Sequence, residues 1–205
     1  MIAIVDYGMG NVRSLRNAFE YLGEDVVITS DPTELDAADR IVLPGVGAFG
    51  DAMAAICERG LEHVLTRQAL EVKKPVLGIC LGMQLFSKTS IEHGEHRGLG
   101  WIDADIRRLD VAPPLKVPHV GWNDLHFPAD DWLFLGIRPG EANFYFVHSF
   151  HMVCHNSVDR LATTDYGGAV TAVVRSGNLV AAQFHPEKSQ DNGLKMLGNW
   201  VRWNP

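Results

Sequence analysis

The sequence predicts an α/β fold, a single domain with a mostly parallel central sheet flanked by helices and an antiparallel portion in its second half. Two observations predict it. Short apolar runs alternate with helical patterns through the first ninety residues, and strand-like runs follow with Gly, Pro, Asn and Asp between them. The early strands are apolar on both sides, as in parallel sheets that helices cover on both faces. No break in composition divides the chain, so we expect one domain over residues 1–205.

The first half alternates strands and helices. Asp31 before Pro32, with Glu34 three residues after the Asp, is typical of a helix start, because Asp caps free amides and Pro fits the first turn. In chain order we expect a strand at 2–5, a helix at 12–22, a strand at 26–29, a helix from Pro32, a strand at 41–43, a long helix at 49–70, a strand at 76–80 and a helix from about Met83.

The second half is richer in strands. We expect them at 102–109, 117–120, 144–153, 169–175 and 179–184. A final helix would carry Leu194, Leu197 and Val201 inward, because these residues recur at helical spacing.

Charge and composition exclude several classes of protein. The chain has 18 basic and 25 acidic residues, and a net charge of -7 opposes binding to nucleic acid or to an anionic membrane. No apolar run approaches the ~18 residues of a membrane span, and the N-terminus lacks a basic leader. The three cysteines, Cys57, Cys80 and Cys154, are scattered and suggest no disulfide framework. We expect a soluble cytoplasmic protein.

Cys80 stands where a buried strand turns into a helix, between Gly78 and Gly82. This Gly-x-Cys-x-Gly pattern is typical of a nucleophile elbow, in which a strained turn holds the side chain out above the sheet. The helix N-terminus would stabilise a thiolate, and the Leu81 N–H would point toward a developing oxyanion. The alternative is a buried structural cysteine, which is the commoner role of a free Cys.

A nucleophile needs a base, and the base needs a group that orients it. His185 and Glu187 follow the last apolar strand, and in an extended chain residues two apart share a side. Pro186 between them would keep that geometry stiff. His185 can take the thiol proton of Cys80 and later donate it to leaving ammonia, while Glu187 holds the ring. The alternative is a structural histidine.

A dinucleotide site is a weaker interpretation. Gly45, Gly47 and Gly50 have the Gly-x-Gly-x-x-Gly spacing, but Pro44 interrupts the turn and the preceding strand is the third of the chain.

A zinc site and a reactive Cys57 are also disfavoured. In one extended strand His148 and Cys154 would face one side while His151 and His155 face the other, so we expect no metal site. Cys57 lies between apolar residues in a helical pattern, and we expect it in the core.

These motifs make the chain similar to the triad-type (class I) glutamine amidotransferases. Residues 78–84 and 185–187 resemble the two catalytic signatures of that superfamily, in its order. Residues 4–11, 44–49, 118–123 and 144–149 narrow the resemblance to glutaminase subunits of imidazole glycerol phosphate synthase, over essentially the whole chain. The resemblance implies a flavodoxin-like fold.

The resemblance also implies a function. Such subunits hydrolyse glutamine to glutamate and ammonia through a Cys-His-Glu thioester mechanism. The ammonia passes to a separate (β/α)8-barrel cyclase, which makes imidazole glycerol phosphate and aminoimidazole-carboxamide ribotide in histidine biosynthesis. The two subunits form a heterodimer, and the glutaminase needs no metal or organic cofactor.

Residue roles follow from the same resemblance. For the carboxylate that contacts glutamine, Glu92 is assigned and Glu95, three residues away, is the alternative. Phe150 stands where the family has a tyrosine, so any hydrogen bond to glutamine there must be made by the backbone. The implied roles are Cys80 as nucleophile, His185 as acid and base, Glu187 as orienter, Leu81 and the Gly45–Val46 peptide as oxyanion donors, Gly47, Gln84, Glu92, Ser149 and Phe150 as glutamine contacts, and Asn11, Trp122, Tyr145 and Lys188 as partner contacts.

The glycine at position 45 suggests how activity could be gated. If the Gly45–Val46 peptide rests with its N–H turned away, the oxyanion hole is half built, and Gly45 lets that peptide rotate at small steric cost. Losing one oxyanion donor typically costs ~10²–10³ in rate.

Three other functions stay open from sequence. The same chemistry could serve another synthase, of the anthranilate or aminodeoxychorismate type. The chain could be a non-catalytic homologue, although the intact triad opposes that. It could also be a γ-glutamyl hydrolase that acts without a partner.

Overall fold

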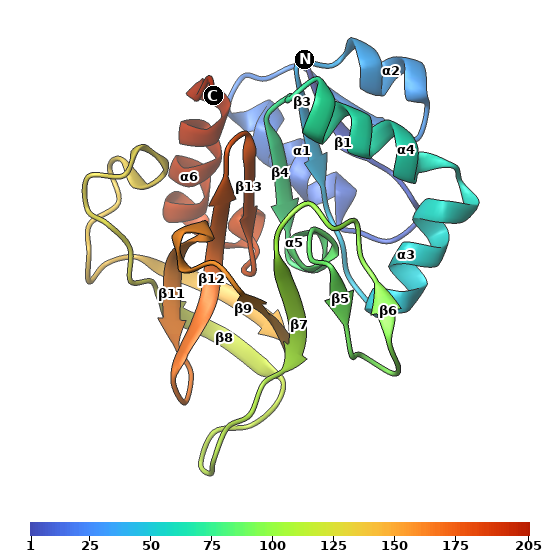
Figure 1. Ribbon diagram of the computed structural model, residues 1–205. Helices are drawn as coiled ribbons and strands as arrows, with labels where there is room; N and C mark the ends of the chain where they lie inside the picture. Colours follow the sequence, from blue (N-terminus) through green and yellow to red (C-terminus); the bar gives the residue numbers. More distant parts are fainter.

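The computed structural model describes all 205 residues and contains a seven-stranded central sheet (Figure 1). Its strand order is β11-β12-β13-β4-β3-β1-β2. The strands are β1 (Ile2–Val5), β2 (Val26–Thr29), β3 (Arg40–Leu43), β4 (Val76–Ile79), β11 (Arg160–Asp165), β12 (Ala169–Ser176) and β13 (Leu179–Ala182).

The central sheet is parallel where the sequence predicts it and antiparallel at one edge. Strands β2, β1, β3, β4 and β13 run parallel, whereas β12 and β11 pair antiparallel beyond β13. Every residue of β1, β4 and β13 is buried, as expected for strands that helices cover on both faces. The predicted fold class is therefore confirmed.

Helices lie on both sides of this sheet (Figure 1). One apolar core packs α3 and α4 against it, and the other packs α1 and α6 together with β9. The α-helices are α1 (Val12–Tyr21), α2 (Pro32–Ala37), α3 (Phe49–Glu58), α4 (Leu61–Thr66), α5 (Leu81–Leu85) and α6 (Gln190–Arg202). The predicted helix start at α2 is confirmed, because the Asp31 carboxylate accepts a hydrogen bond from the Thr33 amide at 2.8 Å.

Two smaller sheets complete the second half. A four-stranded sheet has the order β10-β7-β5-β6, and β8 pairs with β9 as a separate antiparallel ribbon. Their strands are β5 (Thr89–Ser90), β6 (His96–Arg97), β7 (Ala104–Arg108), β8 (His119–Asp124), β9 (Asn143–His148) and β10 (Phe150–Cys154).

Two predicted elements are each divided in the structure, and the strand predicted at 117–120 is β8, which begins and ends later. The long helix at 49–70 is broken at Gly60, which adopts φ +68 and ends α3, and a π-helical turn at Arg67–Glu71 follows α4. The strand at 144–153 is two strands, because the chain changes sheets after His148: β9 pairs with β8, and β10 pairs with β7. The edge strand β11 has no counterpart among the strands predicted from sequence.

Cys57 is exposed, which contradicts its predicted place in the core. The buried stripe of α3 is Phe49, Ala52, Met53 and Ile56, and Cys57 lies one residue past it. Its thiol donates to the Glu62 carboxylate at 3.3 Å.

The fold offers neither a membrane span nor a metal-binding cluster. None of the helices is long and apolar enough to cross a membrane. No three His, Cys, Asp or Glu side chains gather as a metal-binding group.

Candidate functional site

Cys80 lies at the junction of β4 and α5 with its backbone in an unusual conformation. Its φ of 56 and ψ of -110 fall where side chains other than glycine are rare, which is the geometry of a strained elbow. The flanking glycines make the turn possible: a Cβ on Gly82 would lie 1.9 Å from the Leu43 carbonyl oxygen, and one on Gly78 would lie 2.9 Å from the Gly82 carbonyl oxygen. The thiol is buried and lies 3.9 Å from the Val147 carbonyl oxygen.

His185 reaches Cys80 because β13 and β4 are adjacent parallel strands, with Ala182 opposite Ile79. The His185 Nδ1 and the Glu187 Oε1 are 2.9 Å apart, and both side chains are almost fully buried, 3% and 1% exposed. The extended segment predicted here is wrong. Instead Pro186–Lys188 is a 3₁₀ turn, which still brings the two side chains together.

The charge of the His185 ring is set by its neighbours. Burial opposes that charge, but the Cys80 sulfur and the Glu187 carboxylate outweigh it and raise the pKa of His185 to about 10. Because Glu187 can only accept, Nδ1 carries a proton toward it. The buried Nε2 makes no hydrogen bond of ordinary geometry, so it is the nitrogen available to the Cys80 sulfur and to a reacting group.

Backbone contacts fix the position of His185. Its amide donates to the Tyr145 carbonyl oxygen at 2.9 Å, and its carbonyl oxygen accepts from the buried Ser189 hydroxyl at 2.6 Å. The Ser189 oxygen in turn accepts from the Tyr145 amide at 3.0 Å. The start of α6 and strand β9 thus hold the histidine against the end of β4.

The segment between β3 and α3 closes over Leu81. The Leu81 amide donates to the Gly45 carbonyl oxygen at 3.3 Å, so the N–H expected to bind an oxyanion is occupied. The Tyr7 hydroxyl donates to the Pro44 carbonyl oxygen at 2.8 Å, and a Cβ on Gly45 would lie 2.6 Å from that hydroxyl oxygen. Burial raises the pKa of the Tyr7 hydroxyl, and the negative charge of Cys80 adds a smaller effect in the same direction. The hydroxyl therefore keeps its proton and remains a hydrogen-bond donor.

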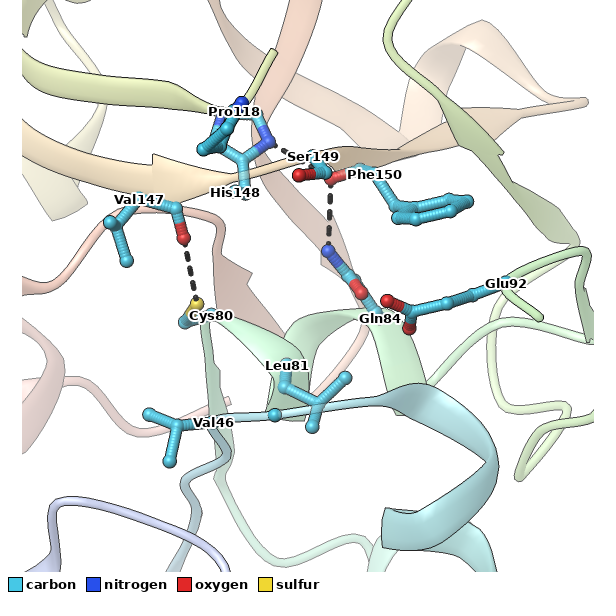
Figure 2. A pocket seen from close by; sticks show the side chains of 11 residues that line it. Val46, Cys80, Leu81, Gln84, Glu92, Pro118, Val147, His148, Ser149 and Phe150 are labelled. Atoms are coloured by element: carbon cyan, nitrogen blue, oxygen red, sulfur yellow. Dashed lines mark hydrogen bonds between the residues drawn. The ribbon is translucent and has the colours of Figure 1, made fainter.

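A cavity of about 230 Å³ opens beside Cys80 (Figure 2). All five residues expected to contact glutamine line it, together with Cys80, Leu81 and Val46. Gly45, His185 and Glu187 are not among the lining residues, which are Val46, Gly47, Cys80, Leu81, Gln84, Glu92, Pro118, Val147, His148, Ser149 and Phe150.

The cavity has two chemically different ends. Cys80, Leu81 and Val46 lie at one end, and Gln84 and Glu92 at the other (Figure 2). A Glu92 oxygen accepts from the first amide of α3 at 2.7 Å, which anchors the carboxylate at the cavity.

The amide of Gln84 is oriented by its neighbours. Its nitrogen donates to the Phe150 carbonyl oxygen at 3.0 Å and to the Gln183 side-chain oxygen at 3.1 Å. Both amide hydrogens are therefore used, and the Gln84 oxygen is left to accept from a ligand. Glu95, the alternative to Glu92, lines a different surface pocket.

Besides Gln183 and Ser189, four residues beside the cavity have no role assigned from sequence. Pro118, Val147 and His148 line the cavity, and Tyr7 anchors the segment beside it. All four lie inside sequence segments that carried the family resemblance, so their motifs were visible although their contacts were not.

Three of the four residues expected to contact the partner subunit lie close together, namely Trp122, Tyr145 and Lys188. The Lys188 ammonium lies 6.0 Å from the Tyr145 ring centre, and the Tyr145 and Trp122 rings are also 6.0 Å apart. Trp122 is 46% exposed, and Lys188 is exposed as well. Asn11 lies directly before α1, beyond the end of β1.

Comparison with solved structures agrees with the fold. The chain superposes on the structure of PurLQS from Thermotoga maritima with a TM-score of 0.72 at 22% identity, covering 98% of this chain and 96% of that one. A crystal structure described as a glutamine amidotransferase gives a TM-score of 0.71 at 21% identity, covering 98% of this chain and 100% of that one.

Comparison with known sequences is closer. Residues 3–202 match the family described as glutamine amidotransferase class-I. The chain is 49% identical to imidazole glycerol phosphate synthase subunit HisH 2 of Nitrobacter winogradskyi, over 100% of this chain and 99% of that protein. It is 45% identical to the subunit HisH of Rhodospirillum rubrum, again over 100% and 99%. The chain therefore belongs to the class-I glutamine amidotransferase family, among the HisH subunits of imidazole glycerol phosphate synthase.

Proposed function

We propose that this chain hydrolyses glutamine to glutamate and ammonia as the glutaminase subunit of imidazole glycerol phosphate synthase in histidine biosynthesis. The observation that carries the proposal is the cavity, which places a buried cysteine at one end and two polar side chains, Gln84 and Glu92, at the other. Glutamine has a matching polarity, with an amide at one end and a charged amino-acid group at the other. The names of relatives that are 43% to 49% identical support this synthase over one of the anthranilate type.

Glutamine would bind with its ammonium group at the Gln84 and Glu92 end. The Glu92 carboxylate supplies the opposite charge, and the unused Gln84 oxygen accepts a hydrogen bond. The side-chain amide then extends toward Cys80, where the reaction occurs.

In the first half of the reaction, the Cys80 thiolate attacks the amide carbon and the oxygen becomes negative. The Leu81 N–H stabilises that oxygen once it is released from Gly45. The imidazolium of His185 gives its Nε2 proton to the nitrogen, the C–N bond breaks, and ammonia leaves a thioester on Cys80.

In the second half, the neutral His185 takes a proton from water, and the hydroxide formed attacks the thioester carbon. The C–S bond breaks, glutamate leaves, and the Cys80 thiolate and the imidazolium are restored. Glu187 holds the ring and stabilises its charge in both halves, because its hydrogen bond to Nδ1 persists throughout.

We infer further that the ammonia passes to a (β/α)8-barrel cyclase bound over the mouth of the cavity, as a heterodimer. The exposed apolar side chains Val46, Val120, Trp122 and Val147 lie on the segments that surround the site. Lys188, exposed beside Tyr145, can pair with an acidic group of the barrel. The match over the full length of HisH subunits supports this partner.

Glutamate release from glutamine tests the proposal. It is measured with the purified chain alone, with the barrel cyclase, and with the cyclase carrying its phosphoribosyl substrate. We expect almost no glutamate release by the chain alone, strong stimulation by the cyclase with its substrate bound, and loss of activity in Cys80→Ala.

Other outcomes identify the alternatives. Full activity without a partner would indicate a free-standing hydrolase, and no response to this cyclase would indicate a different synthase. No activity in any mixture would indicate a non-catalytic homologue.

A further inference from the structure

A chain of hydrogen bonds crosses the β8–β9 ribbon and ends in the wall of the cavity. His119 and His148 are opposite each other in the register of the two strands, and both are buried, 3% and 6% exposed. The His119 Nδ1 lies 3.0 Å from the His148 Nε2. The His148 Nδ1 lies 2.9 Å from the Phe150 carbonyl oxygen, and the His119 Nε2 lies 3.3 Å from the Asn123 amide nitrogen.

Backbone groups at both ends determine where each proton lies. The Phe150 carbonyl can only accept, so His148 is protonated at Nδ1 and its Nε2 accepts from the His119 Nδ1–H. At the other end, the Asn123 nitrogen donates to the Asp165 carbonyl oxygen at 2.9 Å and its oxygen accepts from the Asp124 amide at 2.8 Å.

The orientation of the Asn123 amide is therefore fixed. Its second hydrogen goes to the His119 Nε2, which must be unprotonated. The assignment made from the Asn123 end agrees with the one made from the Phe150 end.

The surroundings keep both rings neutral. Burial lowers the pKa of His148 to about 3, and neighbouring His119, His151 and His185 add to the effect. Burial also lowers the pKa of His119 to about 4. The His119 ring is stacked between Phe146 and Tyr166, with ring centres 4.8 and 3.9 Å away.

The Phe150 carbonyl oxygen, at the end of this series of hydrogen bonds, also contacts a side chain of the proposed glutamine pocket. The Phe150 carbonyl oxygen accepts a second hydrogen bond, from the Gln84 nitrogen at 3.0 Å, so its two lone pairs hold His148 and Gln84 (Figure 2). The orientation of the Gln84 amide thus depends on where His148 holds that carbonyl.

We propose that His148 is a positioning residue for glutamine: its ring, held in one tautomer by His119 and Asn123, fixes the Phe150 carbonyl and through it the Gln84 amide. This role rests on the proposed glutaminase function. His148 does not touch the reacting atoms, and it acts on binding of the amino-acid end of the substrate.

Two amide substitutions separate the two nitrogens of the ring. In His148→Asn the amide nitrogen takes the place of Nδ1 and can still donate to Phe150. In His148→Gln the amide lies at the place of Nε2 and can face only His119. With the cyclase and its substrate present, we expect His148→Asn to keep KM for glutamine within about twofold of the native value. We expect His148→Gln to raise KM ~5–10-fold, as loss of one buried hydrogen bond does, with little change in kcat.

His151 provides the matched control. It lies on β10, its Nδ1 is buried without a hydrogen-bond partner, and His151→Gln should leave KM unchanged. Nitrogen-15 NMR of histidine-labelled native chain supplies a readout that does not need activity. We expect His148 to carry its proton on Nδ1 at neutral pH and to stay uncharged at pH 5.

The outcomes separate the two proposals. A proton on Nε2, a charged His148 ring at neutral pH, or equal damage from the Asn and Gln variants would overturn the positioning role. An active native enzyme with native KM in His148→Gln would overturn that role and leave the glutaminase function intact. A native enzyme that releases no glutamate with its partner would overturn the glutaminase function, and the positioning role with it, even where NMR gives the expected tautomer.

Discussion

The amide of Leu81 donates to the carbonyl oxygen of Gly45 at 3.3 Å, so the N–H expected to stabilise an oxyanion already has a partner. In a trans peptide the N–H points opposite the C=O, so the Val46 N–H is directed away from Leu81. One expected oxyanion donor is therefore occupied, and the other is turned away. Rotation of the Gly45–Val46 peptide would release the Leu81 N–H and also redirect the Val46 N–H. The gating hypothesis drawn from Gly45 in the sequence requires both changes.

Val46→Pro should lower the stimulated activity ~10²–10³-fold, because proline removes the N–H that would complete the oxyanion hole. KM for glutamine should change little. Val46→Ala is the control, since it keeps the N–H and the side chain is already 40% exposed. The measurement is glutamate release with the loaded cyclase, and a Pro variant that matches the Ala variant would contradict the prediction.

Tyr7→Phe should raise the activity of the chain alone several-fold, with a smaller stimulation by the partner. The change removes the hydrogen bond to Pro44 that anchors the resting segment. Tyr166→Phe is the matched control, because its hydroxyl also donates to a backbone carbonyl, that of Lys116 at 2.6 Å. An increase of equal size in both variants would show a general loosening of the fold.

Glu187→Gln should lower the pKa of His185 from about 10 toward its ordinary value, because the carboxylate helps to hold the proton on the ring. An NMR titration of the ring measures this shift, and glutamate release should fall in parallel. Glu62→Gln, which changes the carboxylate beside Cys57, should leave the His185 pKa unchanged. A His185 pKa that stays at about 10 in Glu187→Gln would show that the Cys80 sulfur alone holds the proton.

The same shift makes stability depend on pH. The folded pKa of about 10 lies above the unfolded value of ~6.5, so the folded protein holds the proton more tightly. The stabilisation is complete below pH ~6.5 and is lost as pH rises through about 10. The free energy of unfolding should therefore fall over this window in the native chain, and less steeply in His185→Gln. The free energy of unfolding is measured by urea titration at each pH. An equal pH dependence in the native chain and in His185→Gln would contradict the prediction.

Cys80→Gly should be more stable than Cys80→Ala by about 1 kcal/mol, because glycine accepts a φ of 56 without strain. In an ordinary helix the sign is opposite, and Ala54→Gly at an exposed position of α3 should lose about 1 kcal/mol. Urea unfolding measures both differences. Equal stability of Cys80→Ala and Cys80→Gly would show that the elbow stores no strain.

Glu92→Gln should raise KM for glutamine and leave kcat nearly unchanged, because the change removes the charge that we propose binds the ammonium group of glutamine. The Gln side chain still offers an oxygen to the Phe49 amide, so the start of α3 is preserved. Glu95→Gln tests the alternative left open by sequence and should have native kinetics. Reversed results for the two variants would assign the ammonium to Glu95.

Local patterns predicted the strand–helix order and the elbow at Cys80, because both depend on neighbours in sequence. They failed at Gly60, where one left-handed residue divides an apolar pattern that continues on both sides. They also failed after His148, where the chain passes from one sheet to another without a turn signal in its composition. The contacts of His148 and Tyr7 join residues distant in sequence, which periodicity does not reveal.

The pairing of β4 with β13 has a consequence for the order in which the protein becomes active. The Cys80 thiol and the Gln183 amide that approaches it at 3.9 Å are separated by 103 positions, and His185 follows two residues later. During synthesis the elbow can form while its histidine has not yet been made. The thiol of a nascent chain has no His185 imidazole beside it until β13 docks beside β4, so glutamine hydrolysis cannot begin before that strand is in place.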